Sequence, residues 1–125
     1  MLVVDGANVV GSRPNGWWRD RAGAAEKLRS ALVDAVRDGR LDAPVVVVLE
    51  GAARRVAEGE EDGVRVVHAA GHGDDGIVAT AEQAVASGEQ VTVVTADREL
   101  RGRVERLGGS VVGPRWLLDL MPDGG

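Results

Sequence analysis

Leu2-Val3-Val4-Asp5-Gly6-Ala7-Asn8-Val9 is the stretch of sequence that decides the fold. Three apolar residues, two of them β-branched, end at an acid that is followed by glycine, and this pattern predicts a buried strand that ends in a tight turn. Asp5 is therefore expected at the carboxyl end of a central strand. In open α/β sheets, ligands bind in the crevice beyond these ends, where the strand order reverses.

The rest of the chain alternates predicted strands with predicted helices. Four further strands are expected at residues 44–49, 64–68, 90–95 and 110–112, and helices at residues 21–37, 74–87, 98–107 and 114–120. This alternation predicts a three-layer α/β/α fold with a central parallel sheet of about five strands. At 125 residues, the chain has the length of one domain, which we expect to span residues 1–125.

The segments between these elements carry turn and capping signals. Residues 11–18 contain Pro14 and an Asn-Gly pair, so we predict a loop that leaves from the same sheet edge as Asp5. Residues 52–63 are charged and contain glycine, and they are predicted to form a solvated loop or an irregular helix. We expect Asp74 to cap the helix that follows it, and Asp97 to cap the next one.

Composition limits the classes of protein to consider. Cysteine is absent, so the chain has neither a disulfide framework nor a thiolate metal site. No apolar run reaches the length of a membrane span, and Met1 leads directly into the first strand, so we expect a cytoplasmic protein without a signal peptide or membrane partner. The formal net charge of −5 argues against a generally basic nucleic-acid surface. That objection weakens if carboxylates gather in one pocket and bind divalent cations.

Acidic residues recur where predicted strands end or where the next helix begins. They are Asp5, Asp74, Asp75 and Asp97, and Glu50 stands in a similar position. Carboxylates gathered at one sheet edge repel one another unless a cation compensates their charge. Oxygen ligands without His or Cys at ligand spacing favour Mg²⁺ or Mn²⁺, and such a site suits phosphodiester hydrolysis. The plainer interpretation of Asp74 or Asp97, taken singly, is helix capping.

These motifs resemble the NYN domain of the PIN-like nuclease superfamily, and its YacP-like branch in particular. The matching segments are Val4–Val9, the valine-rich strand before Glu50-Gly51, Asp74-Asp75 and Val94–Arg98, which together span nearly the whole chain. The resemblance implies Mg²⁺-dependent RNA cleavage, with Asp5, Asn8, Asp74, Asp75 and Asp97 at the family's functional positions. Two departures stand out: Glu50 replaces a usual Asp, and Ala7 replaces a frequent aromatic residue.

Contacts to RNA are expected outside the acidic set. Trp17 and Trp18 can stack on unpaired bases, with Arg13, Arg19 and Arg21 on phosphates, although one tryptophan can instead anchor the loop. Arg98, beside Asp97, is the best phosphate ligand among the arginines of its helix. The acidic composition also suggests a ribosome or another partner that presents the RNA.

Two smaller polar side chains, Asn8 and His72, are open to two interpretations. The Asn8 amide can orient Asp5 or a metal-bound water, or Asn8 can be an ordinary turn residue. His72 can be a general acid or a residue of a mobile loop, whereas we interpret His68 as structural.

Three other functions have to be compared with ribonuclease activity, each on a particular feature of the sequence. Gly71-His72-Gly73-Asp74-Asp75-Gly76 matches the dinucleotide-binding pattern, but two aspartates would stand where a pyrophosphate must lie. A haloacid-dehalogenase-type phosphatase would need a second Asp at position 7, which is Ala7. A PIN-like module that binds RNA or a ribosome without cleaving RNA remains the alternative, and metal-dependent digestion of RNA separates it from a nuclease.

Overall fold

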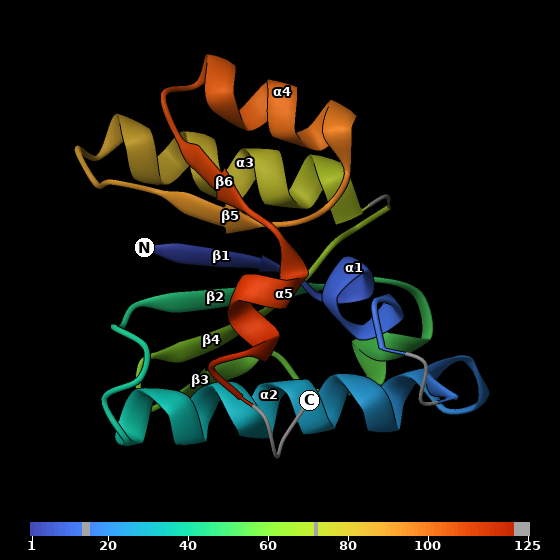
Figure 1. The fold of residues 1–125 in the computed structure, drawn as a ribbon. Coiled ribbons are helices and arrows are strands. Elements are labelled where there is room, and N and C mark those ends of the chain that lie inside the picture. Colours follow the sequence, from blue (N-terminus) through green and yellow to red (C-terminus); the bar gives the residue numbers. More distant parts are fainter. Residues whose placement is uncertain (14–15, 72, 122–125) are drawn as a thin grey trace.

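The computed structural model describes residues 1–13, 16–71 and 73–121 (Figure 1). The strands are β1 (Leu2–Asp5), β2 (Val45–Leu49), β3 (Gly59–Glu61), β4 (Val64–His68), β5 (Thr92–Val94) and β6 (Ser110–Val112). The helices are α1 (Gly6–Gly11), α2 (Arg21–Arg37), α3 (Gly73–Ala86), α4 (Arg98–Arg106) and α5 (Pro114–Leu118), and two 3₁₀ turns are η1 (Trp17–Arg19) and η2 (Gly51–Arg55).

One six-stranded sheet in the order β3-β4-β2-β1-β5-β6 forms the middle layer. β3 is antiparallel to β4, and the other neighbouring strands are parallel. Helices α3 and α4 lie on one face, while α1, α2 and α5 lie on the other (Figure 1). The predicted three-layer α/β/α fold is therefore confirmed, with one more strand than expected.

The chain order reverses at β1. From β1 the chain continues to β2 and β4 on one side, and it later returns to β5 and β6 on the other side. The carboxyl ends of β1 and β5 therefore flank the switch point, the place where open α/β sheets bind their ligands. Within residues 1–13, 16–71 and 73–121, no helix is both long and apolar enough to cross a membrane.

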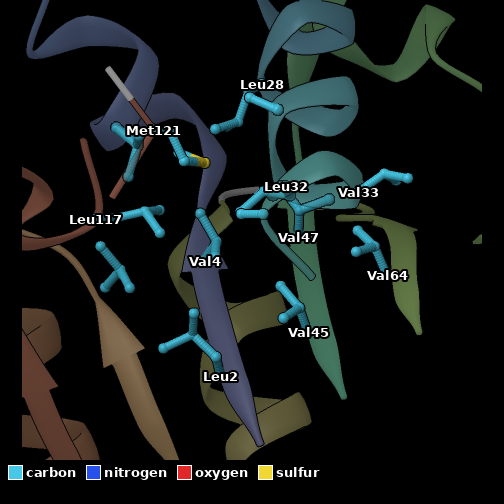
Figure 2. Close-up of a cluster of buried hydrophobic side chains, with 14 of the residues drawn as sticks. Leu2, Val4, Leu28, Leu32, Val33, Val45, Val47, Val64, Leu117 and Met121 are labelled. Carbon is cyan, nitrogen blue, oxygen red and sulfur yellow. The ribbon is translucent and has the colours of Figure 1, made fainter. Parts of the chain in front are cut away.

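Aliphatic side chains fill the core on both faces of the sheet. Alternate residues of β1 point to opposite faces, so Val4 joins the cluster beneath α2 while Val3 joins the cluster beneath α3 and α4. Figure 2 shows Leu32 of α2 and Leu117 of α5 near Val4. This packing fixes β1, and with it the position of Asp5 at the sheet edge.

One prediction about the irregular segments is wrong, and another is incomplete. The tight turn expected after Asp5 is helix α1, because the Asp5 carboxylate caps its first turn and Val9 is buried in the core. Residues 52–63 were predicted as a solvated loop or an irregular helix; η2 agrees with the irregular helix, whereas β3 was not expected. Polar β3 is held by its pairing with β4 and by ion pairs from Arg29 and Arg37 of α2.

The expected start of the helix predicted at residues 74–87 is also corrected. Helix α3 begins at Gly73, so Asp74 lies inside its first turn and is not the N-cap. Glu50 supplies an acceptor there instead, because its Oε2 lies 2.6 Å from the Gly73 amide nitrogen. Asp97 caps α4 as predicted, accepting a hydrogen bond of 3.0 Å from the Leu100 amide.

Candidate functional site

Asp5 is the buried acid at the centre of the site. It is the last residue of β1, and only 6% of its surface is exposed. Its Oδ1 accepts a hydrogen bond of 3.3 Å from the Asn8 amide, and its Oδ2 accepts one of 2.9 Å from the Thr95 hydroxyl. A carboxylate in this environment is held rigidly, at the edge where the strand order reverses.

Two hydrogen bonds join the β1 side of the switch point to the β5 side. The first is the bond from Thr95 to Asp5, and the same Thr95 oxygen accepts from the Asp97 amide at 3.1 Å. In the second, the Asn8 side-chain oxygen accepts from the Ala96 amide at 2.9 Å. Asn8 thus contacts Asp5 through its backbone and secures residues 95–97 through its side chain.

Thr95 was missed by the sequence reasoning. A threonine at the end of a valine-rich segment is typical of a strand, so its type carries no functional signal by itself. The available signal was its place two residues before Asp97, where its hydroxyl can bond to the backbone of the turn. Thr95 is buried, and it positions both Asp5 and Asp97.

Glu50 and Asp74 bring further negative charge toward Asp5. Glu50 follows β2, the strand beside β1, and its carboxylate holds the amino end of α3. Asp74 lies in the first turn of that helix, partly exposed. Because β1 and β2 are parallel neighbours, Glu50 and Asp5 lie at the same edge of the sheet.

The pKa values of Asp5 and Asp74 are both raised, by burial and by neighbouring carboxylates. Burial is the main cause that raises the pKa of Asp5, and the charges of Asp74 and Glu50 raise it further, while the bonds from Thr95 and Asn8 oppose the shift. The pKa of Asp74 is raised first by burial and then by Asp97 and Glu50. The carboxylates are therefore close enough to destabilise one another's charge, which a cation would relieve.

Asp75 is placed differently from the other acids. It is exposed, and its Oδ1 accepts a hydrogen bond of 3.1 Å from Arg103 of α4. Asp75 is therefore directed to an arginine rather than to Asp5. Its role as a metal ligand stays a prediction.

The carboxylates approach one another without closing around an ion. Among residues 1–13, 16–71 and 73–121, no three acidic or histidine side chains form a group that could hold a metal ion as they stand. The donor set nevertheless fits Mg²⁺ or Mn²⁺ in kind, since it consists of carboxylate oxygens, which are hard ligands.

The two tryptophans after α1 have different environments. Trp17 is half-buried, with the Arg21 guanidinium 5.4 Å from the centre of its ring. Trp18 meets it edge-on with ring centres 6.2 Å apart, and 56% of its surface is exposed. Trp17 is thus packed against its neighbours, whereas Trp18 presents much of its ring to solvent, and base stacking by either stays a prediction.

The predicted phosphate ligands also differ. The Arg13 guanidinium is partly buried and donates to the Met121 carbonyl at 3.3 Å, so it holds the segment that follows α5. Arg98 is exposed at the first position of α4, beside Asp97.

The structure supports the interpretation of one histidine. His68 has its Nε2 2.6 Å from the Val56 carbonyl oxygen, which agrees with a structural role. His72, the proposed general acid, lies outside the described residues.

A cavity of about 500 Å³ opens beside the acids. Apolar side chains of α1, α2, β2 and η2 line it, and Trp17, Arg21 and Glu50 supply its polar and aromatic lining. Glu50 belongs both to this cavity and to the charged group around Asp5. The cavity therefore borders the charged group at Glu50.

Known proteins share this sequence pattern and architecture. A family model described as the YacP-like NYN domain matches residues 2–122. The crystal structure of Rae1 (YacP) from Bacillus subtilis with the W164L mutation matches with a TM-score of 0.76 at 20% identity, covering 97% of this chain and 74% of that chain. Rae1 without that mutation matches with a TM-score of 0.69 at 20% identity, covering 98% and 73%. No curated protein sequence matches the chain.

Proposed function

This chain belongs to the YacP-like NYN domain family, and we propose that it is a cytoplasmic, metal-dependent endoribonuclease that hydrolyses RNA phosphodiester bonds at its carboxylate edge. One observation carries the proposal. Asp5, buried at the switch point, has a pKa raised by burial and by the charges of Asp74 and Glu50. Placing a buried acid beside two partly exposed acids of the same charge adds no stability to the fold, so this arrangement indicates a functional site.

The metal would be Mg²⁺ or Mn²⁺, with Asp5, Asp74 and Asp97 as ligands and Asp75 available after it leaves Arg103. When bound, such an ion activates water and stabilises the charge that grows on the phosphate. Glu50 sets the position of α3 and adds charge at the same edge. Thr95 and Asn8 hold Asp5 and Asp97 at a fixed separation across the switch point.

The RNA would contact η1 and the amino end of α4, which belong to separate segments of the chain. Trp18 is exposed for stacking on an unpaired base, and Arg98 is exposed for contact with a phosphate. The net charge of −5 opposes RNA binding by general attraction, so a ribosome or another partner that presents the RNA is part of the proposal.

Digestion of RNA tests this function. Purified protein is incubated with single-stranded and with structured RNA in Mg²⁺, in Mn²⁺ and in chelator, and products are resolved on a denaturing gel. Internal cleavage is expected with either metal and none in chelator. Asp5→Asn is the matched control, and cleavage by this variant at the wild-type rate would contradict the assignment.

The second candidate is a non-catalytic module that binds RNA or a ribosome. It is favoured by the spacing of the carboxylates, which within the described residues form no group of three that could hold an ion. This function predicts RNA retention without cleavage in either metal. The same digestion, repeated with ribosomes present, separates the two functions.

A further inference from the structure

We propose that the cavity beside Glu50 is a binding site for one unpaired nucleobase of an RNA strand whose backbone lies along the carboxylate edge. This inference rests on the proposed function for the identity of the ligand, but not on catalysis. The residues of the cavity lining that matter for this inference are Gly6, Ala7, Trp17, Arg21, Leu49 and Glu50.

The size and lining of the cavity suit a flat, mainly apolar group. Its volume of about 500 Å³ lies in the range of sites for small organic ligands. Gly6 and Leu49 pack closely in the floor of the cavity, since a Cβ on Gly6 would lie 2.7 Å from the Leu49 side chain and 2.8 Å from the Val48 carbonyl oxygen. The described lining therefore offers an apolar floor with few polar groups above it.

Trp17 and Arg21 give the cavity an aromatic and cationic wall. The Arg21 guanidinium lies over the Trp17 ring, 5.4 Å from its centre. Guanidinium planes and indole rings both stack on bases, and arginine also pairs with phosphate. A nucleotide satisfies both preferences at once, with its base inside the cavity and its phosphate near Arg21. An aliphatic side chain of a protein partner would satisfy only the apolar floor.

The position of the cavity also favours RNA. Gly6 and Ala7 directly follow Asp5, and Glu50 borders both the cavity and the charged group. A base held in the cavity would lie close to the part of the RNA backbone that reaches the carboxylates. The cavity would thus select an unpaired nucleotide next to the cleaved bond, because a base in a duplex cannot enter it.

The test uses adenosine as the probe, in chelator, so that neither metal nor cleavage enters the measurement. Amide signals of the protein are followed by NMR during titration with adenosine, and with ribose as the control for the sugar. Signals of Gly6, Ala7, Gly51 and Gly71 are expected to shift with adenosine and not with ribose.

Two alanine variants form a matched pair. Ala7 is exposed at the rim of the cavity, so Ala7→Leu fills it without removing core packing. Ala52, exposed on η2 and absent from the described lining, provides Ala52→Leu as the control. We expect Ala7→Leu to weaken adenosine binding about tenfold or more, the order of one lost base stack, and Ala52→Leu to leave it unchanged.

Each outcome decides the proposal. Equal shifts with adenosine and ribose, or equal binding by Ala7→Leu and Ala52→Leu, overturn it. Shifts with N-acetyl-leucine amide but not with adenosine overturn it in favour of a protein partner. Adenosine binding that Ala7→Leu abolishes supports the base site even if no RNA is cleaved in Mg²⁺ or Mn²⁺, a result that would overturn only the nuclease function.

Discussion

The Thr95 hydroxyl donates a hydrogen bond of 2.9 Å to Asp5 Oδ2, joining two residues 90 positions apart in the chain. Both groups are buried, and the same Thr95 oxygen accepts from the Asp97 amide. One hydroxyl therefore fixes the central acid and the turn that carries a second acid. Its removal should affect both the charge state of Asp5 and the spacing across the switch point.

Thr95→Val is expected to move the acidic limb of the pH–rate profile to higher pH. The bond from Thr95 lowers the pKa of Asp5, so its loss raises that pKa, and the carboxylate then forms only at higher pH. Folding stability should fall by about 1–3 kcal/mol, because buried polar groups lose their partner. Thr95→Ser keeps the hydroxyl and is the control. An unchanged acidic limb in Thr95→Val would show that this bond does not control Asp5.

Asp5→Asn is expected to abolish cleavage while stabilising the metal-free fold at neutral pH. The pKa of Asp5 is raised above 3.8 in the folded protein, so the folded state binds the proton more tightly than the unfolded chain does. Stability from this group is present below the unfolded pKa and is lost as pH rises through the folded pKa. At neutral pH the asparagine removes that cost, about 1.4 kcal/mol for each pKa unit relieved.

Thermal melts in chelator check this prediction. The advantage of Asp5→Asn should be largest at neutral pH and should disappear as the pH falls below 3.8, where the wild-type carboxyl becomes protonated in both states. A variant that is less stable than wild type at neutral pH would mean that capping of α1 outweighs the buried charge.

The sequence predicted the regular elements well, since α2 spans Arg21–Arg37 and β4 spans Val64–His68 as expected. It failed where tertiary contacts override local preference. The segment that forms α1, Gly6–Gly11, begins and ends with glycine and contains adjacent valines, so its helix propensity is low. Residues 59–61 are polar, and only the pairing with β4 and the arginines of α2 make them a strand.

The candidate site was predicted at the level of its elements but not of its contacts. The order of strands in a parallel sheet places Asp5 and Asp97 at one edge, and the sequence pattern was sufficient for this step. The directions of the side chains depend on neighbours distant in sequence. Asn8 bonds to Ala96, and Asp75 bonds to Arg103, and neither partner was apparent from local spacing.

Two variants of Glu50 distinguish its structural role from its electrostatic role. Glu50→Gln keeps an oxygen for the Gly73 amide at the start of α3, so the fold should be retained while metal affinity falls. Glu50→Ala loses the acceptor as well and should lower stability by about 1 kcal/mol, as for a lost helix cap. Calorimetric titration with Mg²⁺ and thermal melts measure the two effects. Equal Mg²⁺ affinity in Glu50→Gln and wild type would exclude a role for its charge.

The two tryptophans should respond differently to truncation. Trp18→Ala is expected to weaken binding of single-stranded RNA by about 1–3 kcal/mol with little change in melting temperature, because this exposed ring is available for base stacking. Trp17→Ala should lower the melting temperature as well as the affinity for RNA, because Trp17 is half-buried beneath Arg21 and also lines the proposed base site. Fluorescence anisotropy with labelled RNA and thermal melts test the pair. If Trp18→Ala lowered the melting temperature and Trp17→Ala did not, Trp18 would be the anchor of this segment and Trp17 the ring that stacks on a base.

Arg103 is expected to restrain metal binding. Its guanidinium holds Asp75 at 3.1 Å, and its charge lowers the pKa of Asp74, which shows that the field of Arg103 reaches that carboxyl. Arg103→Gln should therefore tighten Mg²⁺ binding by up to about fivefold, the size of a screened surface interaction. Asp75→Asn should lower stability in chelator by a few tenths of a kcal/mol, because the ion pair and a first-turn acid of α3 are both lost.

Melts of both variants across a Mg²⁺ series measure these effects, with Arg101→Gln as the control because Arg101 pairs with Glu105 on the same helix. If Asp75 leaves Arg103 to bind the ion, Asp75→Asn also reduces the stabilisation by Mg²⁺, and Arg103→Gln increases it. If Asp75 is only an ion-pair partner, Asp75→Asn leaves the Mg²⁺ response unchanged, since the lost contact lies outside the metal site. Weaker Mg²⁺ binding by Arg103→Gln would contradict the restraint, because a repelling charge cannot assist the binding of a cation.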